Sequence, residues 1–344
     1  MNFKTDKARK LVNVNKITHE EWLEYRKLGI GGSDASAVAG LANPKYNSAF
    51  KVYQKKTEEF VTVEEPSEYA EMGHHYEPTI REIFKSKNPH LQVYRSNFMW
   101  QSLECPFVLA NVDGLIYDKE NGWGVLEIKN ISEHRLKEFG EKTFPIEFQI
   151  QVSHYLFCLD LKWGKFAVVI GGNKYREYDI ARNDELIEYL INLERNFWMN
   201  HVVPQIPPSP DGSEASAKAL LEAFPNIKDP EEVLTLPKDV KSLTEAYEFY
   251  KDEESKAKTK KEKVKQDLMK LMGSYQKAQI EGDEKKIHWS MNRAFDAVKV
   301  REAHPDLYEE YVKPTFDSKG FQKAYPNIYD ECMKPTKKRT FNYK

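Results

Sequence analysis

The chain has 344 residues, more than a usual single domain, and its 52 basic and 54 acidic residues leave a net charge of −2. That balance excludes a polycation that coats nucleic acid with its whole surface, although it permits a local basic face. A hydrophobic fraction of 40% with 12% aromatic residues excludes a wholly disordered chain, and no uninterrupted apolar run approaches the ~18 residues of a membrane span.

The first ninety residues are predicted to be mainly helical. Thr18 and Glu21 have the S/T-x-x-E pattern of a capping box, which predicts a helix that begins there. After a glycine-rich break, Ser33 is predicted to cap the next helix, with Asp34 in its first turn. Pro78 is expected to kink or restart the last of these helices. The predicted helices cover residues 18–27, 33 onward, 48–56 and 67–87.

Beyond Pro89 the pattern changes to short extended segments rich in Val, Ile, Leu and aromatic residues. Asn121 and Gly122 give a strong tight-turn signal between the second and third segments. One helix is predicted between the third and fourth strands, and an amphipathic helix follows the fourth. The predicted strands cover residues 91–94, 107–117, 123–131 and 165–170, and the helices cover 145–161 and 183–202.

A Pro-rich stretch at residues 204–212 predicts a domain boundary. We therefore expect a first domain over residues 1–203, a connecting segment over 204–236 and a charged C-terminal extension over 237–344. The extension is predicted to contain a long charged helix, whose plain interpretation is a solvated or coiled-coil face. Its predicted elements are that helix at 238–272, short strands at 276–280 and 285–289, and a basic tail at 334–344.

A pair of acidic residues and a lysine carry the chemistry that the sequence predicts. Glu127 and Lys129 project from one face of a strand because side chains alternate along it, and apolar neighbours flank both. Asp113 lies on the preceding strand, within ~3–10 Å of Glu127 depending on the register of the turn. Two carboxylates beside a lysine suit a hard divalent cation such as Mg²⁺. The plain alternative is a surface hairpin with a salt bridge.

Two further segments bring polar groups toward this strand pair. Glu77 could add a third carboxylate from the helix before the strands, although an exposed helix glutamate is the plain alternative. Gln151 and Tyr155 lie one turn apart on the helix after Glu127. His154 belongs to the core-facing stripe of the same helix and is interpreted as a packed histidine.

A glycine-rich helix start forms a candidate phosphate site. Ser33 follows two glycines at the start of a helix, and Arg26 lies seven residues earlier. Free N–H groups at a helix N-terminus, a hydroxyl and a guanidinium together can bind a phosphate. A simple helix cap is the plain alternative.

The cysteine content and the N-terminus indicate the compartment. Cys105, Cys158 and Cys332 are too few and too scattered for a disulfide framework or an iron–sulfur cluster. The N-terminus lacks the apolar region of a signal peptide. We expect a cytoplasmic, reduced protein.

Five ordered sequence blocks resemble the YqaJ-type viral recombinase family, the lambda-exonuclease-like branch of the PD-(D/E)XK nucleases. The blocks are RKLGIGGSDA at 26–35, MGHHYEP at 72–78, ANVDG at 110–114, LEIK at 126–129 and QVSHYL at 151–156. The resemblance implies an α/β fold with a mixed central sheet flanked by helices, here followed by a charged helical extension. It also implies a phage or prophage protein that acts in the bacterial host cell.

The resemblance implies a metal-dependent 5′→3′ exonuclease on linear duplex DNA, which hydrolyses phosphodiesters by a two-metal-type mechanism. Mg²⁺ is the implied cofactor, with Mn²⁺ as a substitute. The products are 3′ single-stranded tails for a single-strand annealing recombinase, and lambda-type relatives form homotrimers. No membrane partner is implied.

The resemblance assigns a role to each candidate residue. It makes Asp113, Glu127, the backbone carbonyl of Ile128 and the auxiliary Glu77 metal ligands. It makes Lys129 the residue that positions the attacking water, with help from Gln151. The implied contacts to the 5′-phosphate and the DNA are Arg26, Ser33 and Tyr155.

Three positions depart from the family pattern. Val112 replaces a proline that shapes a turn, Asn111 replaces a small hydroxyl residue, and Phe148 replaces a frequent tyrosine. Two alternatives stay open. One is an endonuclease of the restriction or nicking type with the same active site, and the other is a recombination scaffold that binds DNA without cutting it.

Overall fold

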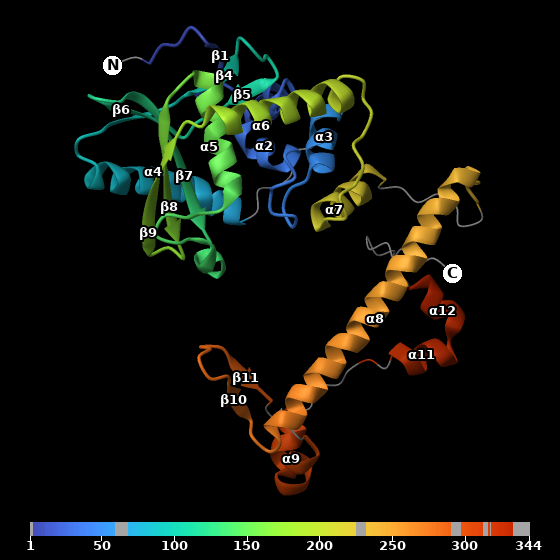
Figure 1. The fold of residues 1–344 in the computed structure, drawn as a ribbon. Helices are drawn as coiled ribbons and strands as arrows, with labels where there is room; N and C mark the ends of the chain where they lie inside the picture. Colours follow the sequence, from blue (N-terminus) through green and yellow to red (C-terminus); the bar gives the residue numbers. More distant parts are fainter. Residues whose placement is uncertain are drawn as a thin grey trace. The chain divides into compact units, whose positions relative to one another are not determined.

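The computed structural model describes residues 3–58, 68–224, 232–289, 297–311, 316 and 318–332. The chain divides into two compact units, Met1–Ile227 and Lys228–Lys344, and each is described by itself (Figure 1). None of the helices in the described part of the chain is long and apolar enough to cross a membrane.

A five-stranded sheet in the order β3-β6-β7-β8-β9 forms the centre of the first unit. β7 and β8 run parallel, whereas the other neighbours are antiparallel, so the sheet is mixed. The expected mixed α/β class is therefore confirmed. The strands are β3 (Gln92–Arg95), β6 (Gly114–Asp118), β7 (Gly122–Ile131), β8 (Trp163–Ile170) and β9 (Lys174–Ala181).

Two helices cover the opposite faces of this sheet (Figure 1). Phe84 of α4 (Glu68–Lys87) packs with Leu126 and other side chains of one face. Leu156 of α5 (Ile146–Leu159) packs with Val125 and other side chains of the opposite face. Leu126 and Val125 are adjacent in β7, and alternation sends them to opposite sides. Because Glu127 is two residues from Val125, it faces α5.

A second sheet of four strands has the order β1-β4-β5-β2. The sequence patterns did not predict β1, β2, β4 or β9, and the single strand predicted over residues 107–117 is wrong. Residues 108–110 pair in this second sheet, whereas residues 114–118 belong to the central sheet. The break has a polar cause. The carbonyl of Asn111 accepts from the Tyr155 hydroxyl, and the carboxylate of Asp113 accepts from the Ile128 N–H. The strands are β1 (Ala8–Asn13), β2 (Ile30–Gly31), β4 (Phe98–Ser102) and β5 (Val108–Ala110).

The N-terminal helices mostly follow the prediction. The Thr18–Glu21 capping box is present at the start of α1. The prediction that Ser33 caps the next helix is wrong, since that helix starts at Gly32 and the Asp34 carboxylate accepts the Gly31 N–H at 3.2 Å. α4 continues through Pro78 without a restart. The bounds are α1 (His19–Lys27), α2 (Gly32–Val38) and α3 (Ala49–Thr57).

The C-terminal part of the first unit packs back onto its early helices. α6 ends in one turn of π-helix, and Ser216 of α7 donates to the hydroxyl of Ser48 at 2.9 Å. α7 thus belongs to the first unit, although it lies inside the segment that we expected to connect the domains. The remaining elements are η1 (Val14–Lys16), η2 (Glu133–Glu138), α6 (Asp184–Phe197), η3 (Trp198–Val202) and α7 (Glu214–Ala223).

The second unit begins with the predicted long charged helix. It spans α8 (Lys241–Met272) and is followed by the predicted pair of strands, so both predictions are confirmed. The basic tail at 334–344 lies outside the described residues. The other elements are η4 (Lys238–Val240), β10 (Lys277–Gln279), β11 (Lys286–His288), α9 (Ala297–Ala303), α10 (Pro305–Tyr311), α11 (Ser318–Ala324) and α12 (Pro326–Glu331).

Candidate active site

The side chain of Glu127 lies in the interior of the first unit with 1% of its surface exposed. Its Oε1 accepts a 2.7 Å hydrogen bond from the Gln151 amide and is in contact with the Lys129 ammonium. Its Oε2 is buried and has no hydrogen-bond partner. The structure thus joins Glu127, Lys129 and Gln151, and the two members of the E-x-K pair share one face as predicted.

Burial and a neighbouring negative charge raise the pKa of Glu127. Its removal from water is the larger cause and Asp113 adds to it, so that the pKa rises to about 8 despite the opposing charge of Lys129. For Lys129, burial favours the neutral amine, but the carboxylates of Glu127 and Asp113 raise the pKa. A buried carboxylate oxygen without a partner is costly, and a bound cation would remove that cost.

Asp113 immediately precedes β6, and the register of β6 against β7 places it next to Glu127. Its Oδ2 accepts the backbone N–H of Ile128 at 2.8 Å. In an extended strand the N–H and C=O of one residue point to the same side, so the carbonyl of Ile128 faces the same edge. Arg81 donates to the Asp113 carbonyl at 3.0 Å and is in contact with the carboxylate of Glu77. Arg81 thus connects Glu77 to this edge.

The donor set fits a small divalent cation that keeps several of its waters. Mg²⁺ commonly uses one or two protein carboxylates, and Asp113 and Glu127 supply two. Among the described residues, no group of three or more His, Cys, Asp or Glu side chains is arranged to hold a metal ion. The third expected carboxylate, Glu77, is bound to Arg81 instead.

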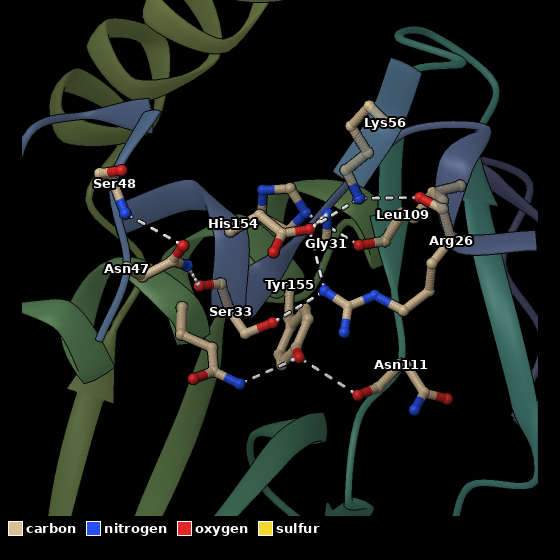
Figure 2. A network of polar contacts seen from close by, with 12 residues as sticks. Arg26, Gly31, Ser33, Asn47, Ser48, Lys56, Leu109, Asn111, His154 and Tyr155 are labelled. Carbon is tan, nitrogen blue, oxygen red and sulfur yellow. Dashed lines mark hydrogen bonds and ion pairs between the residues drawn. The ribbon is translucent and has the colours of Figure 1, made fainter. Parts of the chain in front are cut away.

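Tyr155 links the carboxylate cluster to the start of α2. Its hydroxyl accepts from the Gln151 amide at 3.1 Å and donates to the Asn111 carbonyl at 3.2 Å. Only 3% of the residue is exposed, and its ring leaves no room for a Cβ at Gly32. Figure 2 shows the ring between Ser33 and the Asn111 carbonyl. Tyr155, which was predicted to contact DNA, is therefore buried inside the protein and connects the carboxylate cluster to the start of α2.

The predicted phosphate residues lie together above that ring (Figure 2). The guanidinium of Arg26 donates to the Ser33 hydroxyl at 3.1 Å and to Asp34 at 2.9 Å. It also lies over the indole of Trp22, with 5.0 Å between the guanidinium carbon and the ring centroid. The Arg26 side chain keeps 25% of its surface exposed, so it is open to a ligand.

Two members of this cluster were not predicted from the sequence. They are Lys56 and the carboxylate of Asp34, which acts as an ion-pair partner. The ammonium of Lys56 lies 2.8 Å from Asp34 Oδ2 and donates to the Arg26 carbonyl at 2.8 Å. Burial disfavours charge on Asp34, but Arg26 and Lys56 hold its pKa far below the usual range. Two cations against one anion leave the cluster with one positive charge. Asp34 and Lys56 are 22 positions apart in the chain, which explains why no local pattern predicted their contact.

His154 lies in the interior beside Tyr155 and is a packed histidine, as predicted. One ring nitrogen lies 2.8 Å from the Glu194 carboxylate and the other 2.9 Å from the Leu109 carbonyl, and both ionisable side chains are fully buried. Burial favours a neutral ring, but the charge of Glu194 raises the pKa of His154. The pair fixes α5 between α6 and β5.

Similar proteins identify the family to which the chain belongs. Residues 21–162 match the YqaJ-like viral recombinase domain. The YqaJ protein of Bacillus subtilis (strain 168) is 30% identical over 321 residues, which cover 90% of this chain and 95% of the relative. The chain belongs to the YqaJ-like viral recombinase family.

Two solved structures are similar to part of the chain. One is an alkaline exonuclease (LHK-Exo) from Laribacter hongkongensis, with 19% identity, a TM-score of 0.43, and coverage of 54% of this chain and 94% of that chain. The other is a phage-related exonuclease from Haemophilus somnus 129PT, with 11% identity, a TM-score of 0.39, and coverage of 54% and 99%.

Family membership supports a role in recombination, which acts on DNA. The resemblance found from the sequence blocks is thereby confirmed.

Proposed function

We propose that the chain is a Mg²⁺-dependent 5′→3′ exonuclease that degrades one strand of linear duplex DNA. The observation that carries this proposal is the link through Tyr155 between a buried carboxylate cluster and the cluster of Arg26, Asp34 and Lys56, which has a net positive charge. The first cluster would carry out the hydrolysis, and the second would bind the phosphate at the end of the DNA strand. The 3′ tails would then be substrates for a single-strand annealing recombinase, and a homotrimer is part of the same proposal.

Asp113, Glu127 and the carbonyl of Ile128 would hold the metal. When bound, it would supply an activated water and stabilise negative charge on the phosphate. Gln151 fixes Glu127 Oε1 by its hydrogen bond and so sets the direction of the unpaired Oε2. Lys129 contacts Glu127 but has 30% of its side chain exposed, so its remaining N–H groups can orient the attacking water and stabilise charge at the phosphorus.

The end pocket would select the bond that is cut. Arg26 and the Ser33 hydroxyl would bind the terminal 5′-phosphate, and Asp34 and Lys56 would hold Arg26 in place. Water then attacks the next phosphorus and its bond to the 3′ oxygen breaks, which releases a nucleotide 5′-monophosphate with a free 3′-hydroxyl. The shortened strand again ends in a 5′-phosphate, so each product end is a substrate for the same pocket.

Cleavage of matched DNA ends tests this proposal. A linear duplex labelled on one strand, with either a 5′-phosphate or a 5′-hydroxyl, is incubated beside a supercoiled circle, with Mg²⁺, with Mn²⁺ or with EDTA. We expect metal-dependent shortening of the 5′-phosphorylated strand from its 5′ end, release of mononucleotides and an intact circle. The variant Arg26→Ala should cut both kinds of end alike.

Each other outcome contradicts part of the proposal. Nicked or linearised circles would identify an endonuclease. Binding without cleavage of either DNA would favour a recombination scaffold. Equal rates on phosphorylated and hydroxyl ends in the unaltered chain would overturn the assignment of the end pocket.

A further inference from the structure

The long helix α8 carries a stripe of side chains at the spacing of a coiled coil. Successive members of the stripe are alternately four and three residues apart, which keeps them on one face over the whole helix. At 1.5 Å per residue, 32 residues extend for about 48 Å. The stripe consists of Leu243, Tyr247, Tyr250, Glu254, Ala257, Lys261, Val264, Leu268 and Leu271.

Large apolar side chains occupy both ends of this α8 stripe and polar ones its centre. Leu243 is 68% exposed, Tyr250 69% and Leu271 83%, so a large part of the apolar surface at both ends faces solvent. Glu254 and Lys261 stand between them and are also exposed. Exposed apolar side chains at both ends of one helix face indicate an interaction surface.

The two halves of α8 carry opposite charges. Residues 241–254 contain five carboxylates and two lysines, whereas residues 255–272 contain seven lysines and two carboxylates. Ion pairs within the helix, such as Lys256 with Asp252, lie off the stripe. Glu254 and Lys261 form no ion pair with any of the described residues. The charge pattern therefore complements itself only when a second α8 runs in the opposite direction.

A groove beside the basic half of the stripe could take apolar side chains of such a helix. It measures about 290 Å³ and lies between α8 and the β10–β11 hairpin, which is next to the C-terminal end of α8 in Figure 1. Apolar side chains line most of it, and Lys261 and Lys265 add positive charge. The apolar lining includes Val264, Leu268, Met272, Ile287 and Trp289.

We propose that α8 pairs with α8 of a second copy of this chain as an antiparallel two-stranded coiled coil. Leu243 and Tyr250 of one copy then lie against Leu268 and Val264 of the other, in the groove. The acidic half of each helix meets the basic half of its partner, and Glu254 comes within about one turn of the partner's Lys261. A parallel pair would instead place Glu254 against Glu254 and like halves together, which is repulsive. This interface does not depend on the proposed nuclease activity.

The molar mass of the full-length chain, measured by light scattering during size exclusion, tests the pairing. Lys261→Glu replaces an attractive contact with Glu254 by a repulsive one, so we expect the mass to fall to half. The molar mass of the unaltered chain should be twice that of the variant even if the first unit also assembles by itself, because the α8 contact joins two equal assemblies. The double variant Glu254→Lys with Lys261→Glu restores opposite charges, and it should restore the full mass.

Lys263→Glu is the matched control. It makes the same change of net charge two residues away but lies off the α8 stripe, so its mass should equal that of the unaltered chain. Circular dichroism checks that all variants keep their helix content. A monomeric unaltered chain, or equal masses for the chain and for Lys261→Glu, would overturn the proposal, and so would an equal loss in Lys261→Glu and Lys263→Glu.

The direction of pairing has its own measurement. A spin label at Leu243→Cys, in a chain with Cys332→Ser, avoids Cys105 and Cys158 because both are buried. Leu243 and Leu271 are 28 residues apart, so antiparallel helices place the two labels about 40 Å from each other. A separation near the ~10 Å spacing of neighbouring helices would mean parallel pairing and would contradict the proposal.

Discussion

The ring of Tyr155 occupies the space that a side chain at Gly32 would need. A Cβ built on Gly32 lies 2.5 Å from the nearest ring carbon of Tyr155, closer than packed atoms allow. The absence of a side chain at the start of α2 therefore lets α5 approach it, and this approach joins the end pocket to the carboxylates. Tyr155 is buried on α5, and its hydroxyl is held by two hydrogen bonds.

Gly32→Ala should therefore destabilise the chain by ~1–3 kcal/mol, the usual cost of overpacking, and slow the cleavage of DNA. Gly73→Ala is the control, because a Cβ there meets nothing within 4 Å and an alanine inside a helix gains up to ~1 kcal/mol over glycine. Urea denaturation of both variants makes the comparison. Equal stability of the two variants would show that the contact with Tyr155 is not tight.

Glu127→Gln should abolish cleavage and the response to Mg²⁺ without weakening the fold. Glutamine keeps the shape but removes the charge that burial disfavours. In a thermal melt, Mg²⁺ should raise the midpoint for the unaltered chain, because a ligand that binds only the folded state stabilises it. The same addition should leave Glu127→Gln unchanged. A similar rise in both proteins would place the metal elsewhere.

Recognition of the 5′-phosphate should weaken as the pH rises through 8. Burial, with the nearby charge of Arg26, lowers the pKa of Lys56 to about 8, although Asp34 opposes the shift. Lys56 is thus charged below this pH and neutral above it, whereas Asp34 and Arg26 stay charged. Tyr155 stays neutral, because burial raises its pKa well above the usual value. The net positive charge of the cluster is lost at high pH.

Cleavage rates on phosphorylated and hydroxyl ends from pH 7 to 9 measure this effect. The ratio of the two rates should fall with pH for the unaltered chain. For Lys56→Met, which loses a charge-assisted contact, the ratio of the two rates should be lower by on the order of tenfold. It should also not change with pH. Lys55→Met is the matched control, because the neighbouring Lys55 is exposed. A pH-dependent ratio in Lys56→Met would assign the titration to another group.

Asp34→Asn should cost ~3–5 kcal/mol of the free energy of unfolding at pH 7, because it leaves Lys56 buried without its counter-charge. The pKa of Asp34 is depressed, so its stabilising effect is present above the unfolded pKa near 4 and is lost as the pH falls below it. Asp6→Asn, at an exposed position, should change little. Chemical denaturation at pH 7 and pH 3 compares the two. An unchanged unfolding midpoint for Asp34→Asn would disprove the predicted strength of the buried pair.

Local sequence signals predicted the elements that depend on near neighbours. The capping box at Thr18 and the alternation of Glu127 with Lys129 are set by spacings of two or three residues, and the structure contains both. The paired carboxylates could be predicted because one turn joins their strands.

Contacts between distant residues were beyond that reasoning. β1 pairs with β4 through contacts such as Ala8 with Ser102, and neither strand has a pattern strong enough to predict alone. The Val-rich run at 107–117 looked continuous because both of its halves are apolar. Hydrogen bonds from Tyr155 and Ile128 divide it, and the Tyr155 hydroxyl comes from a helix 44 positions further along the chain.

The three residues that separate β5 from β6 connect the four-stranded sheet to the five-stranded sheet. The Asn111 carbonyl accepts a hydrogen bond from Tyr155 of α5, and the Asp113 carboxylate accepts one from the Ile128 N–H of β7. A rotation of either sheet against its neighbour would therefore strain both bonds together. We therefore expect this segment to couple the two sheets, so that a ligand in the proposed end pocket should reduce the amplitude of motion at the carboxylates.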